Sequence, residues 1–287
     1  MPWYWRHFTG FIWNMMTIEE PEKAVRVRKM FGRISGSYDL MNRLMTLGRD
    51  RYWRRHVVKK AALPYGGRLL DVGSGTGDIA LEALRRDSTL SVTAADFSLR
   101  MMHMGRRRPA GQKVYWCHAD ALKLPFPDAT FDAVTSGYLV RNVIDVRQAF
   151  EEQMRVVKPG GRVVCLDTSP VPRSALRPFV VFHLKVVIPL LGHLLTRNRA
   201  AYMYLPESTQ AFMAPEQVAS IMRSAGLKDV SYRRFMLGTM AVHTGRRPCL
   251  SPFPKPGHDK TSTSHRHPLT FMLFETIRAG LIPIILA

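Results

Sequence analysis

The feature that most constrains this chain is a glycine-rich turn between an apolar segment and a helical one. Segment 69–72 predicts a buried strand, and segment 79–84 predicts a helix. Between them glycine occupies every second position, at Gly73, Gly75 and Gly77. Only glycine lets a backbone turn this sharply and approach a ligand without a Cβ in the way, and the helix offers N–H groups at its start. The turn indicates a nucleotide-like cofactor, with a tight structural turn as the alternative.

Four further strands follow the turn, with helical patterns between them. The sequence predicts strands at 91–96, 114–118, 131–136 and 162–167. The helical pattern is clearest at 146–157, where apolar residues share one face. Such alternation of strands and helices predicts an α/β fold in which helices cover both faces of a mostly parallel sheet.

Three acids stand at or just after the ends of the first three strands, namely Asp71, Asp96 and Asp120. Open α/β sheets bind ligands at this edge, and Asp96 has the spacing of a ribose-binding carboxylate. Together with the glycine turn and a Pro-Gly-Gly turn at 159–161, these acids resemble class I S-adenosylmethionine-dependent methyltransferases. The resemblance implies their Rossmann-like fold and S-adenosyl-L-methionine as the cofactor. Because all three acids are present, a noncatalytic scaffold of the same fold is disfavoured.

The resemblance also implies roles for individual residues. Asp96 is expected to accept hydrogen bonds from both ribose hydroxyls, and Asp120 from the adenine amino group. The glycines would let the backbone approach the methionine portion, with Thr76 hydrogen-bonding nearby. For Asp96 and Asp120 the alternative is a helix cap or a turn acid. The expected cofactor-binding residues are Asp71, Gly73, Gly75, Thr76, Gly77, Asp96, Asp120, Ala121 and Gly137.

Other blocks narrow the family. They lie at 38–48, 53–55, 120–126, 141–143, 157–161 and 201–208. Together they resemble the ubiquinone/menaquinone C-methyltransferase family, from about residue 27 to about residue 244. The resemblance implies methylation of a ring carbon of a prenylated hydroquinone, by a class I fold with a helical N-terminal cap.

The sequence departs from the family pattern in two places. Leu139 stands where the family usually has glycine, beside the expected ring pocket, and segment 167–169 reads Asp-Thr-Ser in place of Glu-Phe-Ser. Both changes are expected to leave the cofactor site untouched and to affect which quinol ring the protein accepts as its substrate. The motifs do not separate a naphthoquinol from a benzoquinol, although Gly137-Tyr138 favours the naphthoquinol.

Ring methylation needs a base or bridging water that takes the phenolic proton, or a fixed cation that stabilises the phenolate. Arg141 follows the fourth predicted strand, where it could face the ring. Because arginine is permanently charged, it suits stabilising a phenolate or orienting water better than acting as the base. Its alternative is a structural ion pair. Tyr204 and Asn42 complete the predicted catalytic set, and either could instead be a buried, satisfied residue.

The chain has a formal net charge of +20. Basic residues crowd segments 26–60, 85–86 and 106–108. Such a field suits an anionic membrane surface or nucleic acid, with a solvated surface as the alternative. Methylases of base amino groups usually carry Asn/Asp-Pro-Pro-aromatic after the fourth strand, where this chain reads Ser-Gly-Tyr-Leu at 136–139. We therefore expect an anionic membrane surface as partner and no nucleic acid.

Three scattered cysteines, Cys117, Cys165 and Cys249, indicate buried thiols in a reducing compartment rather than disulfides. No histidine, cysteine and carboxylate cluster has ligand spacing, so we expect no metal. The chain is expected in the cytoplasm, peripherally attached to the inner face of the membrane. The sequence leaves homo-oligomerisation open.

The sequence predicts four parts. Residues 1–21 form an aromatic N-terminal extension, 22–247 the methyltransferase domain, 248–267 a linker and 268–287 an apolar tail. Charged residues and a proline interrupt the tail, which favours a surface-lying segment over a membrane span. Both ends are expected to attach to the membrane, the alternative being that they are disordered or pack on the domain.

Overall fold

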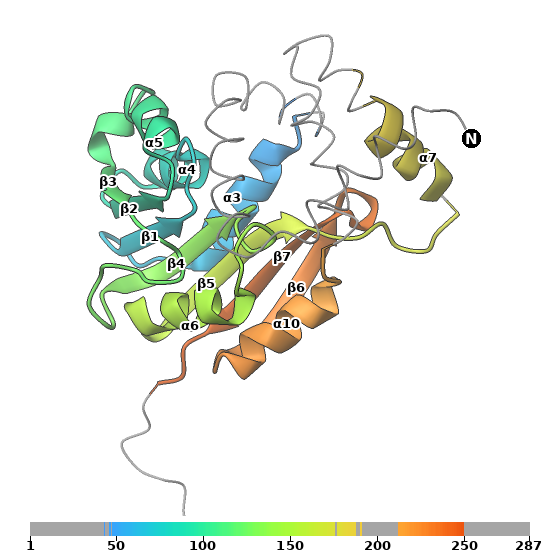
Figure 1. Ribbon diagram of the computed structural model, residues 1–287. Coiled ribbons are helices and arrows are strands. Elements are labelled where there is room, and N and C mark those ends of the chain that lie inside the picture. The colour runs from blue at the N-terminus through green and yellow to red at the C-terminus, as the bar shows by residue number, and fades with distance from the viewer. Residues whose placement is uncertain are drawn as a thin grey trace, which may run out of the picture. The chain divides into compact units, whose positions relative to one another are not determined.

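The computed structural model describes residues 43, 46, 48–175, 177–187, 190 and 212–249. Within them a seven-stranded sheet has the order β3-β2-β1-β4-β5-β7-β6, and β7 alone runs opposite to the other six strands (Figure 1). The strands are β1 (Arg68–Val72), β2 (Ser91–Asp96), β3 (Tyr115–His118), β4 (Phe131–Gly137), β5 (Val157–Thr168), β6 (Lys228–Phe235) and β7 (Met240–Arg246). The predicted α/β architecture with a mostly parallel sheet is confirmed.

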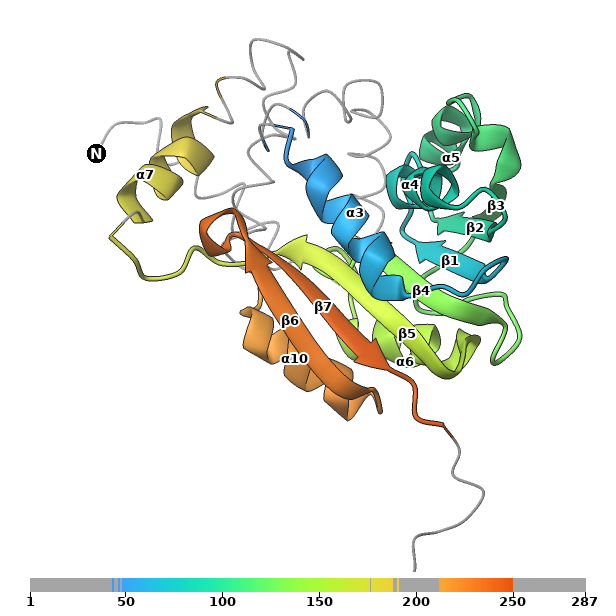
Figure 2. The same ribbon diagram turned by 180° about the vertical axis from the view of Figure 1, so that it is seen from behind.

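Helices cover both faces of the sheet. They are α3 (Asp50–Ala61), α4 (Asp78–Arg86), α5 (Leu99–Arg106), α6 (Val146–Val156) and α10 (Pro215–Ser224), whereas α7 (Arg177–Phe182) has no buried residue and does not cover the sheet. One core cluster packs α3 and α4 against the sheet, and a second packs α6 and α10 against its other face. Figures 1 and 2 show these two layers from opposite sides. Within β1, Leu69 belongs to the first cluster and Leu70 to the second, because successive strand residues point to opposite faces.

Strand β5 begins earlier than predicted. Residues 158–161 were expected to form a turn, but the strand starts at Val157 and its register against β4 shifts between Phe131 and Ala133. Gly160 has φ +79°, a left-handed conformation that favours glycine. The Pro-Gly-Gly sequence is therefore an irregularity inside β5 rather than a separate turn.

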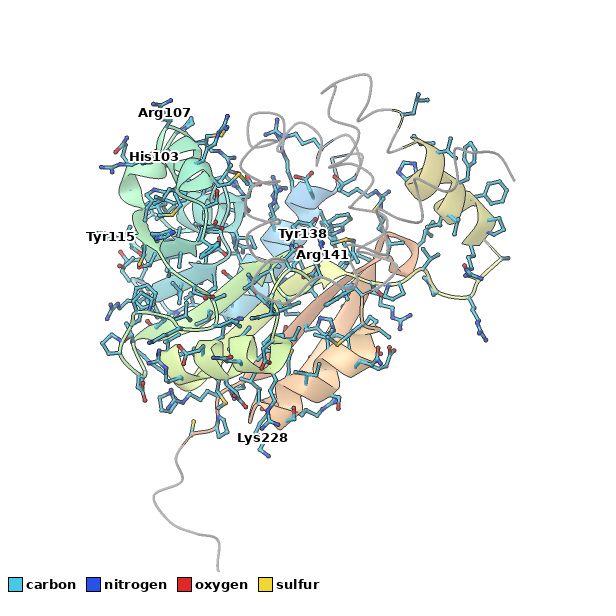
Figure 3. The ribbon with its side chains drawn as sticks, in the orientation of Figure 1. His103, Arg107, Tyr115, Tyr138, Arg141 and Lys228 are labelled. Atoms are coloured by element: carbon cyan, nitrogen blue, oxygen red, sulfur yellow. The ribbon has the colours of Figure 1, made fainter. Side chains whose placement is uncertain are left out.

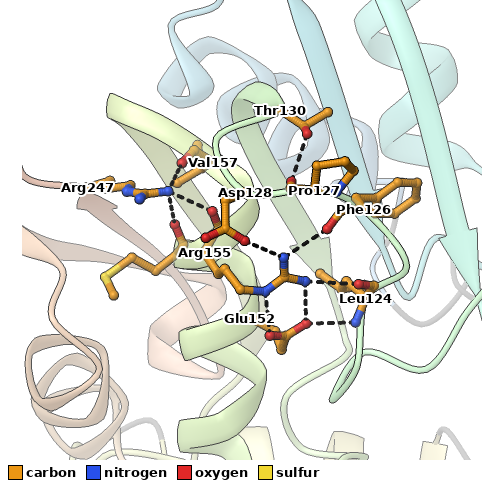
Figure 4. A network of polar contacts seen from close by, with 10 residues as sticks. Leu124, Phe126, Pro127, Asp128, Thr130, Glu152, Arg155, Val157 and Arg247 are labelled. Atoms are coloured by element: carbon orange, nitrogen blue, oxygen red, sulfur yellow. Dashed lines mark hydrogen bonds and ion pairs between the residues drawn. The ribbon is translucent and has the colours of Figure 1, made fainter.

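A guanidinium network ties helix α6 to the loop after β3 that carries Asp120. The Arg155 side chain donates to Glu152, to Asp128 and to the carbonyls of Leu124 and Phe126, at 2.7–2.9 Å (Figure 4). Its charge and hydrogen bonds hold the pKa of Glu152 below the usual range. Residues 124–128 are thereby fixed beside α6.

Replacing Arg155 with methionine should lower the free energy of unfolding by about 2 kcal/mol, because two carbonyls and two carboxylates lose a charged donor. Chemical denaturation measures the change. Arg147→Met is the matched control on the same helix: Arg147 pairs with Glu151 at an exposed position, so its loss should cost at most about 0.5 kcal/mol. Equal effects of the two substitutions would contradict a structural role for the Arg155 network.

Candidate active site

A cavity of about 200 Å³ opens at the carboxyl ends of β1, β2, β3 and β4. Six of the nine predicted cofactor residues line it: Gly73, Gly75, Asp96, Asp120, Ala121 and Gly137. A smaller cavity of about 40 Å³ is lined by Asp71 and Thr76, and it shares Gly73, Gly75, Gly137 and Tyr138 with the larger one. Gly77 lies in the turn and lines neither cavity. Eight of the nine predicted cofactor residues, from Asp71 to Gly137, thus line two adjoining cavities.

The three glycines of the turn have φ values of +65°, +57° and +80° at Gly73, Gly75 and Gly77. A Cβ at Gly73 would lie 2.7 Å from a methyl carbon of Leu139, and one at Gly77 would lie 2.5 Å from the Trp116 ring. The turn thus requires glycine both for its left-handed backbone and for its close packing. This conformation also leaves the backbone bare toward the cavities.

Asp96 joins the end of β2 to the glycine turn. Its carboxylate accepts hydrogen bonds from the backbone N–H groups of Gly75 and Ser98, each at 2.7 Å. Burial raises the pKa of Asp96, and these hydrogen bonds partly offset the rise. Because each carboxylate oxygen has two lone pairs, both can accept a further hydrogen bond from a ligand.

Asp71 is buried at β1 beneath the turn. Its carboxylate accepts from the Thr135 hydroxyl at 3.0 Å and from the Ala80 N–H at 3.3 Å, so it links β1, β4 and α4. Burial raises its pKa to about 7. This buried carboxyl lies at the edge of the smaller cavity.

Asp120 lies in the loop after β3 and is exposed. Its carboxylate accepts from the N–H of Leu122 at 2.9 Å, which fixes a turn around Ala121. The same residue lines the larger cavity, two strands along the sheet edge from the glycine turn. The cavity therefore has a carboxylate at Asp96 and a second at Asp120.

Arg141 is buried in an ion pair. Its Nη1 lies 2.9 Å from Asp167 Oδ1, and its side chain is 2% exposed. The guanidinium lies 5.0 Å from the centroid of the Tyr138 ring (Figure 3). Burial raises the pKa of Asp167, and the Arg141 charge opposes that rise. Arg141 lines neither cavity, and its geometry is that of the ion pair named as its alternative; its catalytic role stays a prediction.

Tyr138 lines both cavities, and sequence reasoning missed it. Its φ is +59°, which is uncommon for a residue with a side chain and typical of functional sites. Its backbone N–H donates to the Leu166 carbonyl at 2.7 Å. In the sequence, the feature that could have indicated Tyr138 as a site residue is its position directly after Gly137, at the end of β4.

Leu139 lines the larger cavity and packs on Gly73. The expectation that the change at this position leaves the cofactor site untouched is wrong. Because the backbone turns back after β4, the Leu139 side chain lies over Gly73 of the glycine turn.

Two predicted catalytic residues, Asn42 and Tyr204, lie outside the described residues, as do the terminal segments 1–21 and 268–287. Most of the expected N-terminal cap and of the linker lies there too. Within the described ranges, no group of three or more histidine, cysteine or carboxylate residues could hold a metal. None of the helices in that part of the chain is long and apolar enough to cross a membrane.

The chain resembles known proteins over most of its length. The ubiE/COQ5 methyltransferase family matches residues 16–247. The ubiquinone/menaquinone biosynthesis C-methyltransferase UbiE of Desulfotalea psychrophila is 49% identical, over 78% of this chain and 91% of that protein. The demethylmenaquinone methyltransferase of Roseiflexus castenholzii is 43% identical, over 78% and 94%. Among solved structures, a SAM-dependent methyltransferase of Thermotoga maritima aligns with a TM-score of 0.54 at 19% identity, over 76% and 98%. The last match confirms the class I methyltransferase fold.

Proposed function

Because this chain belongs to the ubiE/COQ5 methyltransferase family, we propose that it methylates a ring carbon of a prenylated hydroquinone in quinone biosynthesis. It is an S-adenosylmethionine-dependent C-methyltransferase. The observation that carries the proposal is the 49% identity to the Desulfotalea protein. We favour the naphthoquinol of menaquinone biosynthesis, since the Roseiflexus relative is a demethylmenaquinone methyltransferase.

The residues around the two cavities fit S-adenosylmethionine. The glycine turn brings its backbone to both cavities, and Gly137, which also lines both, packs closely on the end of the Ile79 side chain. We assign the ribose hydroxyls to Asp96 and the adenine amino group to Asp120, with Ala121 beside the adenine. The methionine portion then belongs at the glycine turn, near Asp71 and Thr76.

When bound, the cofactor supplies an electrophilic methyl group, and the protein must make the acceptor carbon nucleophilic. Transfer of a phenolic proton to a positioned base or a bridging water would move electron density onto the neighbouring ring carbon. We assign stabilisation of that negative charge to Arg141, because its charge is permanent and its burial strengthens electrostatic interactions. The Tyr138 ring packs on Arg141 and lines both cavities. Asn42 and Tyr204, which lie outside the described residues, complete the proposed catalytic set.

Expression in a host that lacks its own quinone C-methyltransferase tests the acceptor. We expect the lipid quinones of that host to gain one methyl group, as measured by mass spectrometry, and the naphthoquinone pool to gain it preferentially. Asp96→Ala is the inactive control. Persistence of only demethylated quinones, with folded and cofactor-binding protein in the cell, would contradict the proposed acceptor.

We also propose that the enzyme works in the cytoplasm at the inner face of the membrane. A prenylated acceptor resides in the bilayer, and the net charge of +20 suits anionic lipid. Phe97 and Ile144, which line the larger cavity, and the nearby Leu99 are 39%, 40% and 48% exposed. These apolar side chains give the cavity rim a surface that suits a lipid interface.

Co-sedimentation with anionic vesicles tests attachment. The full chain should bind in a salt-sensitive way, because apolar and basic groups act together. The chain restricted to residues 22–247 should bind much more weakly, since the aromatic N-terminal extension and apolar tail are removed. Equal binding by both would place the contact on the body of the protein, and the assignment of the two ends would be wrong.

A further inference from the structure

An arginine from outside the glycine turn reaches the smaller cavity. Arg54 lies on α3, and its side chain is 11% exposed. Its Nη2 lies 2.7 Å from Asp78 Oδ2, and its Nη1 lies 2.8 Å from Asp50 Oδ2. Because Asp78 begins helix α4 directly after the glycine turn, this ion pair fixes the guanidinium beside the turn.

The smaller cavity continues the space that we assign to the cofactor. Arg54 and Asp78 line it together with Thr76, and it shares Gly73 and Gly75 with the larger cavity. A ligand whose nucleoside lies at Asp96 and whose chain crosses the glycine turn would therefore extend toward Arg54. The part of S-adenosylmethionine that crosses the turn is an amino acid with an α-carboxylate and an α-ammonium group.

We propose that Arg54 binds the α-carboxylate of S-adenosylmethionine. Among the described residues that line the two cavities, Arg54 is the only lysine or arginine. A carboxylate in a partly buried site needs a compensating charge. A guanidinium supplies five N–H donors in a planar fork that matches a carboxylate, so it can pair with several anions at once.

The neighbouring carboxylate gives the site a matching second charge. Asp78 and Arg54 present an anion and a cation 2.7 Å apart to the same cavity, an arrangement suited to a zwitterion. Arg108 holds Asp78 from the other side, with Nη1 2.7 Å from Asp78 Oδ1 and 3.0 Å from the Thr76 carbonyl oxygen. Arg108 lines neither cavity, which makes it a matched control for loss of a cation beside Asp78.

Calorimetric titration of the full chain with two ligands tests the proposal. The ligands are S-adenosylmethionine and its decarboxylated analogue, which lacks only the α-carboxylate. Wild-type protein should bind the former more tightly. Arg54→Gln should weaken S-adenosylmethionine binding by about 10- to 100-fold and leave the analogue nearly unchanged, because a charged hydrogen-bond pair of this order is lost. Arg108→Gln should retain the wild-type preference for the carboxylate.

If Arg54→Gln binds both ligands more weakly by the same factor, Arg54 has only a structural role, which it exerts through Asp78. Unchanged affinity for both ligands would place the carboxylate elsewhere, and either result overturns the proposal. Arg54→Lys keeps the charge without the planar fork, and it should fall between wild type and Arg54→Gln in its preference. The inference rests on cofactor use and not on the quinone acceptor, so failure to methylate a quinone would leave it intact.

Discussion

Replacing Asp96 with alanine should lower the affinity for S-adenosylmethionine by about 30- to 800-fold, which corresponds to roughly 2–4 kcal/mol. The carboxylate is assigned two ribose hydroxyls, and it also accepts the N–H groups of Gly75 and Ser98. Its removal therefore takes away direct contacts and loosens the turn that lies against the cofactor. Titration calorimetry on the purified full chain measures the loss.

The matched control is Asp87→Ala. Asp87 ends helix α4 and accepts hydrogen bonds from the Thr89 backbone and hydroxyl, at the opposite end of the helix from the glycine turn. We expect its loss to leave cofactor affinity unchanged. A folded Asp96→Ala protein that binds the cofactor like wild type would remove Asp96 from the site.

Replacing Arg141 with alanine should lower the methyl-transfer rate by roughly 100-fold or more, the scale expected for loss of a group that stabilises transition-state charge. Cofactor affinity should change little, because Arg141 lines neither cavity. Single-turnover transfer with saturating cofactor separates the two effects. Arg141→Lys should restore only part of the rate, since the planar fork toward Asp167 is lost.

The buried Arg141–Asp167 ion pair means that the Arg141 substitution can also change the stability of the protein. Removing Arg141 leaves the Asp167 carboxylate buried without its guanidinium, and breaking such a pair costs about 3–5 kcal/mol. Thermal unfolding must therefore accompany the kinetics. If the alanine variant is unfolded while Arg141→Lys is folded and transfers methyl at the wild-type rate, the ion pair is structural and Arg141 has no catalytic part.

Strands β1 to β5 could be predicted because most of them are short apolar runs separated by helical periods; no helix stands between β3 and β4. The last two strands could not. Strand β6 is an edge strand with mostly exposed side chains, so its sequence has no buried apolar run. Strand β5 was predicted too short because Gly160 and its neighbours resemble a turn, whereas pairing with β4 continues on both sides of the irregularity.

Much of the cofactor site was visible in the sequence because its residues follow strand ends in a fixed order. What the sequence could not show depends on contacts between distant segments. Arg54 reaches the glycine turn only because α3 packs beside α4, and Leu139 covers Gly73 only because the chain turns back after β4. Neither contact has a local pattern that predicts it.

A methyl-transfer reaction with defined reactants tests whether this protein methylates a quinol ring carbon. Purified full chain is incubated with a demethylmenaquinol and S-adenosylmethionine whose transferable methyl group carries deuterium, and the product is fragmented in a mass spectrometer. We expect one CD₃ group on a ring carbon, absent when Asp96→Ala protein is used. A product labelled on a ring oxygen, or no labelled quinol from folded protein that binds the cofactor, would contradict the proposed ring-carbon methylation.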